Sequence, residues 1–540
     1  MSESTTASLL EPSQAPAKAW LTLIAVALGT MVVQLDGTIL AVANPVIAAY
    51  FGSALDGIAW VNTAYLLIMA GLMVPLGTIT DRIGAKKALL TGVAGFAVAS
   101  VLGGLSFSIG MLIGARLLQG FFAAMLVPAG LAAVRQAFPE AKLGIAFGIY
   151  GMVSSLALIG GPLVGGIIVQ FASWHWAFFV NVPVAILSIL IGLFVLPSNS
   201  ARTNPPWDLP GAICFTLGLV GIVWAINGVQ ANGWGSPLTL LPLVVGSVLM
   251  ILFLIVEGRV ADPMVPLSFF RNRNFSIGVG LLVAAMMAFY AVAFYLLFFF
   301  QNIVELTAIQ AGLLALPMTG ASVVASLIAG IISDKLGVRV TLFLGSAALA
   351  VAMFLLTTIN LASTAGSVAP ALVLCGIGVG FITPAATQAI LGSTPPERAG
   401  VASGIQQSGQ QVGSTMGIAV FGSILATVIS SRFLETLPAE ATVNPEVAQI
   451  VSSNTVSQNV STGFGPAAQK QLAEAVSSAL PDHQITTVVQ AVTDAAHSVF
   501  INGLHTVFLV AGSLGVLCTI LALLVDYRPD TTTQDVGERA

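Results

Sequence analysis

Long apolar stretches alternate with short polar segments along nearly the whole chain, and this pattern limits the fold more than any other feature. Fourteen of the stretches are about 20 residues or longer, the length that a helix needs to cross the roughly 30 Å hydrocarbon core of a bilayer. Of the 540 residues, 57% are hydrophobic and only 7% are charged, whereas a soluble protein carries about 25% charged residues. We therefore expect an all-α membrane protein with 14 transmembrane helices. The predicted spans are residues 20–47, 57–77, 87–108, 110–134, 143–170, 176–196, 209–228, 237–257, 275–300, 309–333, 339–359, 368–393, 404–429 and 498–526.

The distribution of lysine and arginine predicts the orientation of these spans. If the N-terminus lies in the cytoplasm, 15 of the 18 basic residues fall in cytoplasmic segments, Arg432 and Lys470 fall outside, and Arg116 lies within the fourth span. Basic residues are enriched in cytoplasmic loops. We therefore expect a multi-pass protein of the cell membrane with both termini cytoplasmic.

An eight-residue motif occurs twice, after the second and after the tenth span. Its copies run from Gly77 to Gly84 and from Gly330 to Gly337, with four identical positions. In a duplicated six-helix unit the second copy would follow the eighth span, so two extra helices separate the halves. Two such halves with a substrate site between them are the plan of the major facilitator fold. The predicted division is a disordered cytoplasmic tail at 1–18, an N-terminal six-helix half at 19–200, two inserted transmembrane helices at 201–262, a C-terminal six-helix half at 263–529 with an external loop at 430–497, and a cytoplasmic tail at 530–540.

The repeated motif combines glycines, which let helix ends approach closely, with a carboxylate that can accept from helix N-terminal amides or from nearby basic side chains. Such a contact would act as a cytoplasmic latch that forms in one transport state and breaks in the other. The alternative is a charged loop whose basic residues only reflect the enrichment of lysine and arginine in cytoplasmic loops. The candidate latch residues are Gly77, Asp81, Arg82, Gly84, Gly330, Asp334, Lys335 and Gly337.

Two ionisable residues lie deep within predicted spans, Asp36 in the first and Arg116 in the fourth. A charge in lipid costs several kcal/mol, so the two should face each other or a cavity. Competition for Asp36 between a proton, Arg116 and a cationic substrate would suffice for exchange. The alternative is a fixed structural ion pair.

Several motifs resemble those of the 14-spanner drug:proton antiporters of the major facilitator superfamily. They are Leu35-Asp36-Gly37-Thr38 in the first span, Arg116-Leu117-Leu118-Gln119-Gly120 in the fourth, and Gly160-Gly161-Pro162-Leu163-Val164-Gly165-Gly166 in the fifth. The resemblance covers nearly the whole chain except the N-terminal tail and residues 430–497. It implies proton-coupled export, with Gly161, Pro162, Gly165 and Gly166 forming the glycine–proline motif that this family links to antiport.

Polar and aromatic side chains within spans are candidates for the substrate cavity. Gln407 and Gln411 lie in an unusually polar thirteenth span, where amides face a cavity or bond to another helix. Tyr295 belongs to an aromatic set in the ninth span that could hold apolar or cationic guests or simply face lipid. Gln119, in the fourth span, completes the set of candidates.

The segment 430–497 carries six acidic and two basic residues. Apolar residues at helical spacing after Pro481 predict a helix start at Asp482. The segment reads as a solvated spacer with a short surface helix or, alternatively, as a lid. We expect its residues 440–480 to be dispensable for folding.

The sequence disfavours several other functions. A net charge of −4 disfavours nucleic acid as a partner, and the absence of any Gly-Lys dipeptide disfavours a nucleotide-binding loop. The three cysteines have no metal-ligand spacing, and no enzyme motif is found, so we expect neither metal, cofactor nor catalysis. The predicted function is proton-coupled efflux of small organic, cationic or lipophilic compounds by a monomer. The alternative is a dedicated exporter of one metabolite, such as a diamine, siderophore or antibiotic.

Overall fold

The computed structural model describes residues 17–52, 55–196, 208–260, 262–306, 308–437, 444–477 and 479–525. Fourteen of its helices are long and apolar enough to span a membrane, as predicted, the sixth of them (α7) only together with the short helix before it. They are α1 (Ala17–Phe51), α2 (Leu55–Ile83), α3 (Ala85–Gly104), α4 (Ile109–Ala137), α5 (Leu143–Phe171), α7 (Asn181–Val195), α8 (Leu209–Asn232), α9 (Pro237–Glu257), α10 (Arg273–Phe298), α12 (Leu316–Leu336), α13 (Val338–Leu356), α14 (Ala365–Gly392), α15 (Ala399–Thr436) and α19 (Asp482–Ala522). Apart from residues 17 and 18, the predicted tails 1–18 and 530–540 lie outside the described residues.

Short helices connect or extend these spans. They are η1 (Glu140–Lys142), α6 (Trp176–Phe179), η2 (Leu267–Arg271), η3 (Phe299–Ile303), α11 (Ala308–Leu313), η4 (Pro396–Arg398), α16 (Pro445–Val451), α17 (Asn454–Ser461) and α18 (Pro466–Val476). The predicted span 309–333 is therefore divided between α11 and α12.

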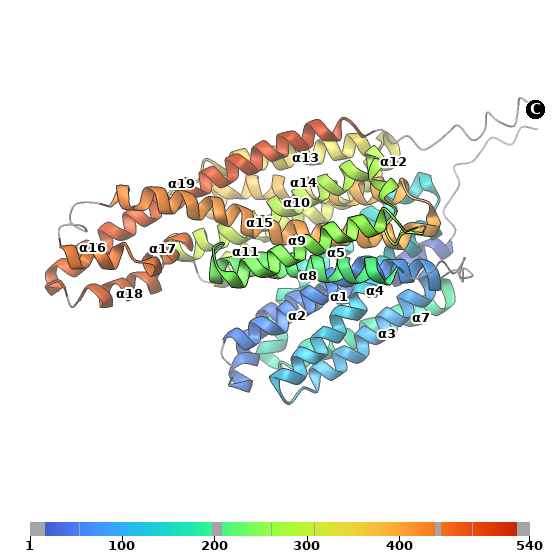
Figure 1. Ribbon diagram of the computed structural model, residues 1–540, viewed down its shortest axis with the longest axis horizontal. Helices are drawn as coiled ribbons and strands as arrows, with labels where there is room; N and C mark the ends of the chain where they lie inside the picture. Colours follow the sequence, from blue (N-terminus) through green and yellow to red (C-terminus); the bar gives the residue numbers. More distant parts are fainter. Residues whose placement is uncertain are drawn as a thin grey trace, which may run out of the picture.

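The helices form two bundles with the same internal packing. In the first bundle α1 packs on α5, α2 and α3 on α4, and α3 on α7. In the second bundle α10 packs on α15, α12 and α13 on α14, and α13 on α19, which repeats these contacts in the same order. The bundles meet where α5 packs on α12 and α2 on α15 (Figure 1).

The extra helices α8 and α9 pack against each other, and α8 also contacts α2 and α15. Only 17% of the apolar window of α9 is buried, so most of this helix is left to face lipid. The structure thus places the inserted pair beside the interface between the bundles (Figure 1).

Helices α16, α17 and α18 form a helical cap that projects at one end of the molecule (Figure 1). Buried side chains of these helices and their connections, which include Val451, Val460 and Phe464, join Val488 and Val492 of α19 in one core. The predicted start at Asp482 is correct, but the helix runs unbroken into the span instead of beginning it at 498. The expectation of a solvated spacer is wrong, because short apolar faces on three helices combine into one core.

Candidate functional site

Asp36 lies at the centre of a fully enclosed hydrogen-bond network, the Asp36 cluster, which comprises Asp36, Ser100, Arg116, Gln119 and Asn181. Each of these side chains is at most 1% exposed. The Asp36 carboxylate accepts from Arg116 Nη1, from Gln119 Nε2 at 3.0 Å and from Asn181 Nδ2 at 2.8 Å. Helices α1, α3, α4 and α7 of one bundle supply these groups. Three donors therefore satisfy the hydrogen-bonding capacity of this buried carboxylate inside the protein.

Arg116 has partners for more than its ion pair with Asp36. Its Nη1 donates to Gln119 Oε1 at 2.8 Å, and its Nε donates to the Val61 carbonyl at 3.2 Å. The guanidinium carbon also lies 4.0 Å from the centre of the Tyr65 ring. These contacts hold the guanidinium next to Asp36. Loss of the carboxylate charge would therefore leave the buried positive charge of Arg116 uncompensated.

The glycines of α5 allow that helix to pack directly against the segment of α1 that carries Asp36. A Cβ on Gly161 would lie 2.5 Å from Thr38 Cβ, and one on Gly165 would lie 3.1 Å from the Ile39 carbonyl oxygen. A Cβ on Gly166 would meet nothing within 4 Å, so the structure gives this residue no packing role. Pro162 lies within α5, but its side chain is outside the described part.

The two motif copies lie at the same end of the bundles, which we call the latch end, and each carboxylate binds the N-terminus of a helix in the other bundle. Asp81 accepts from the backbone N–H groups of Gly400 at 2.6 Å and Val401 at 2.9 Å, at the start of α15. Asp334 accepts from Gly144 at 2.8 Å and Ile145 at 2.9 Å, at the start of α5.

Neither receiving helix has a cap from its own segment. The N-cap positions of α5 and α15 are Lys142 and Arg398, and neither side chain caps the helix. The first amides of a helix need an acceptor, and its N-terminus favours negative charge. Each bundle therefore supplies the N-terminal cap of one helix in the other bundle.

The motif glycines make this approach possible. A Cβ on Gly77 would lie 2.3 Å from the Gly400 carbonyl oxygen, and one on Gly330 would lie 2.5 Å from that of Gly144. Gly84 and Gly337 adopt positive φ angles of 89° and 90° at the turns that follow. Lys335 is exposed, and Arg82 lines a neighbouring cavity.

A central cavity of about 170 Å³ lies between the bundles. Gln34, Tyr150, Ser155, Gln407 and Gln411 line it together with apolar side chains. Ser155 and Ser322 connect the bundles here through hydroxyl groups 3.3 Å apart. None of the described residues that line the cavity carries a charge.

The structure divides the four cavity candidates. Gln407 and Gln411 line the cavity, whereas Gln119 belongs to the Asp36 cluster. Tyr295 is 3% exposed and donates its hydroxyl to the Ile418 carbonyl at 2.6 Å, between α10 and α15. Neither Gln119 nor Tyr295 lines the cavity, because partners in neighbouring helices hold both polar groups.

Sequence analysis missed Asn181, Ser100 and the identity of the two helices whose N-terminal amides donate to the latch carboxylates. The Asn181-Val182-Pro183 run at the start of a span could have pointed to Asn181, since a buried amide needs partners. The basic N-cap positions of two spans could have pointed to a cap supplied from elsewhere.

A duplicated helical bundle with a cavity between its halves defines a membrane transporter of the alternating-access class. The model of the family described as Major Facilitator Superfamily matches residues 26–418. The chain belongs to this family, as its motifs predicted.

Similar proteins include resistance and export proteins. The chain is 33% identical over 505 residues to the tetracenomycin C resistance and export protein of Streptomyces glaucescens, covering 93% of this chain and 91% of the relative. It is 29% identical over 506 residues to the methyl viologen resistance protein SmvA of Salmonella typhimurium, covering 93% and 97%. The human organic anion transporter MFSD10 shares the fold, with a TM-score of 0.56 at 13% identity and coverage of 94% and 100%.

Proposed function

We propose that this protein exports small organic compounds from the cytoplasm in exchange for protons. The latch end faces the cytoplasm in this proposal, as the basic residues predict. The relatives named for resistance and export support the direction of transport. A cell membrane location follows from the same proposal.

The observation that carries proton coupling is the placement of Asp36. It is a fully buried carboxylate within a membrane-spanning helix, held by the guanidinium of Arg116. Protonation of Asp36 would remove the negative charge that holds Arg116, so the cluster has two states with different packing demands. Because α5 packs on Thr38 and Ile39 beside this cluster, such a change acts directly on the helix contact between α1 and α5.

The proton gradient supplies enough free energy for uphill export. A membrane potential of 100 mV is worth about 2.3 kcal/mol per charge, and one pH unit adds about 1.4 kcal/mol. One proton exchanged for one neutral molecule therefore sustains an outside-to-inside substrate concentration ratio of about a few hundred. For a monovalent cation the electrical contribution cancels, which leaves about tenfold.

The central cavity indicates the kind of compound that it could accept. Its amide and hydroxyl groups offer hydrogen bonds, and Met69, Phe289 and Tyr290 offer apolar surface. This mixture fits lipophilic compounds with a few polar groups. Asp36 is enclosed, so charge selection by direct contact with this carboxylate is not what the geometry supports.

Acid release from reconstituted vesicles with an internal pH dye tests the proposal. We expect the wild type to move protons when substrate is added, and Asp36→Asn to lose both this signal and uphill efflux. Asp36→Glu should keep part of it, since the titrating group survives. Arg116→Ala should insert in the membrane but not transport. Asp494→Asn, at an exposed acid, is the matched control.

Proton coupling that persists in Asp36→Asn would place the coupling group elsewhere. Normal transport by Arg116→Ala would show that the ion pair is structural. Both results would contradict the proposal.

A dedicated exporter of one metabolite is the second candidate, because relatives carry the names of single compounds, such as the riboflavin transporter RibZ of Clostridioides difficile. A panel of structurally unrelated compounds in the same vesicles separates the two. Acid release by one compound alone would support the dedicated exporter.

A further inference from the structure

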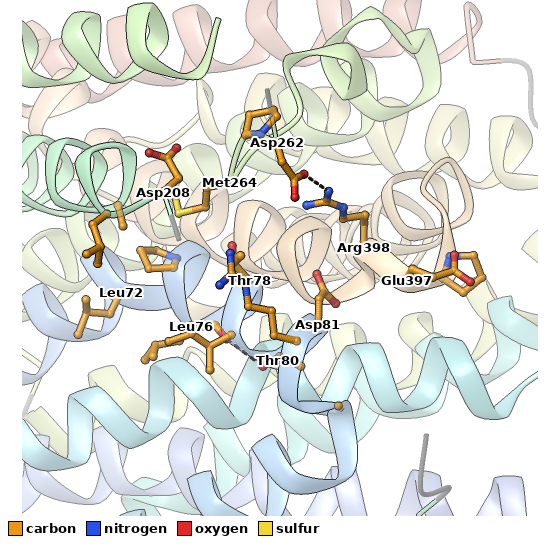
Figure 2. Close-up of a pocket in the computed structure, with 18 of the residues that line it drawn as sticks. Leu72, Leu76, Thr78, Thr80, Asp81, Asp208, Asp262, Met264, Glu397 and Arg398 are labelled. Atoms are coloured by element: carbon orange, nitrogen blue, oxygen red, sulfur yellow. Dashed lines mark hydrogen bonds and ion pairs between the residues drawn. The ribbon is translucent and has the colours of Figure 1, made fainter. Parts of the chain in front are cut away.

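A second cavity, of about 640 Å³, opens at the latch end beside the inserted helix α8; we call it the latch-end cavity. Its volume lies within the range of small-molecule sites. One side is apolar, and Figure 2 shows Leu72 and Leu76 there, opposite Asp208 and Met264. The apolar wall comes from one face of α2 and from the first turn of α8, and comprises Leu72, Pro75, Leu76, Ile79, Leu209 and Ala212.

The lining of this cavity is acidic, unlike that of the central cavity. Four carboxyl groups and two guanidinium groups give it a formal charge of −2. They are Asp81, Asp208, Asp262, Glu397, Arg82 and Arg398. Two of them pair with each other, because Arg398 donates to Asp262 at 2.6 Å (Figure 2). The carboxylates that an organic cation could reach therefore lie here rather than in the Asp36 cluster.

Asp208 is the carboxylate whose bonding is incomplete. Its Oδ1 caps α8 by accepting from the Gly211 N–H at 2.8 Å, while its Oδ2 is shielded from solvent and has no hydrogen-bond partner in the described part. Glu257, at the end of α9, is 3% exposed, lies next to Asp208 and does not itself line the cavity. Its Oε2 also lacks a donor, and its Oε1 accepts from the Val265 N–H at 3.3 Å. Two facing carboxyl groups require a proton or a cation between or beside them.

We propose that the latch-end cavity binds lipophilic organic cations, with Asp208 supplying the charge and the apolar face of α2 supplying hydrophobic contact. The inserted pair α8–α9 thereby acquires a role, since Asp208 and the first turn of α8 form one wall of the site. That the bound cation is cargo rests on the proposed function, whereas its binding does not.

The site is also positioned to act on the latch. Asp81 lines the same cavity while it accepts from the amides of α15. A cation bound here would compete with those amides for the carboxylate. Loading of the site would then weaken one of the contacts that hold the latch end closed.

Direct binding to the full chain in phosphatidylcholine nanodiscs, without a pH gradient, tests this proposal. The probe is tetraphenylphosphonium, and triphenylphosphine oxide serves as a neutral compound of similar shape. We expect Asp208→Asn to weaken binding of the cation roughly tenfold and to leave the neutral compound unchanged. Asparagine caps a helix as well as aspartate does, so this variant retains the start of α8.

A steric variant gives a second reading. Ala212→Trp should fill the cavity and abolish cation binding at this site, while Ile213→Trp, on the exposed face of the same helix, should bind as the wild type does. If Ala212→Trp does not fold, Asp208→Asn alone decides.

Unchanged cation binding in Asp208→Asn and in folded Ala212→Trp would overturn the proposal. Equal losses for the cation and the neutral compound would overturn its charge selection, and occupancy by phospholipid with no bound probe would overturn the site. Because no gradient is present, these results are independent of proton coupling at Asp36.

Discussion

Neutralising either latch carboxylate should open the latch end by a predictable amount. Asp334 accepts two backbone N–H bonds at 2.8 and 2.9 Å, and Asp81 accepts two at 2.6 and 2.9 Å. Asparagine keeps one acceptor oxygen, but its NH2 group replaces the second oxygen and places a donor against a backbone N–H that needs an acceptor. The variant therefore loses one charge-assisted hydrogen bond and the favourable interaction of the charge with the helix N-terminus.

The size of the effect follows from these two losses. A hydrogen bond to a charged group contributes about 1.5–3 kcal/mol, and a charge at a helix terminus contributes about 0.3–1 kcal/mol. In the open state water would bond to part of the freed amide and carboxylate groups. We therefore expect the free-energy difference between the closed and open states to shift by about 2–3 kcal/mol. That shift changes the ratio of closed to open molecules roughly 30- to 140-fold. The two latches share no residues, so the double variant should show nearly the sum.

Distances between spin labels can measure this shift. Lys87 on α3 and Arg339 on α13 are exposed and follow the two motif copies, so cysteines there would report the separation of the bundles at the latch end. The native cysteines Cys214, Cys375 and Cys518 are buried. We expect Asp334→Asn and Asp81→Asn to broaden the distribution toward longer distances. Asp494→Asn is the control for loss of a surface charge.

An unchanged distance distribution in both asparagine variants would refute this reasoning. It would mean that apolar packing alone closes the latch end and that the carboxylates contribute nothing to the equilibrium. A shift in only one variant would show that the two repeats are not equivalent in energy.

Three further substitutions follow from single contacts. Gly161→Ala should lower the free energy of unfolding of the detergent-solubilised protein by about 1–3 kcal/mol, because the added methyl group overpacks against α1. Gly166→Ala should be neutral. Equal thermal unfolding midpoints for the two variants would contradict this. Asn302 donates to a carbonyl of the helical cap at 2.6 Å, so Asn302→Ala should speed protease cleavage within the cap, and unaltered cleavage would show that this bond does not hold it. Asn181→Ala removes one of three donors to Asp36 and should reduce substrate-driven acid release in vesicles, whereas normal release would make that donor dispensable.

Periodicity and charge predicted the helices well, because each span in lipid must satisfy its backbone alone. The start of α19 at Asp482 was predictable from Pro481 and the helical spacing after it. The helical cap was not, because its core combines residues such as Val460 and Val488 from helices with little apolar surface of their own. Such a core depends on tertiary packing that local pattern does not encode.

The site was predictable to a similar degree. Asp36 and Arg116 are charged residues deep within two spans, and the free-energy cost of an unpaired charge in lipid alone predicts that they contact each other. Their enclosure away from the central cavity depends on Asn181 and Ser100, which occupy helices distant in sequence. The helices that donate to the latch carboxylates likewise depend on which helix ends the fold brings together.

Helix α5 connects the two features on which transport would depend. Its first amides are held by Asp334, and its Gly161 and Gly165 pack on α1 beside the Asp36 cluster. About 26 Å of continuous helix separates Gly144 from Gly161. Under the proposed function, a change of packing at Asp36 therefore reaches the latch through one continuous helix. The Asp81 latch holds α15 in the same way, but the cluster has no counterpart on α10 among the described residues, so the proton would act through the Asp334 latch and the cation through the Asp81 latch.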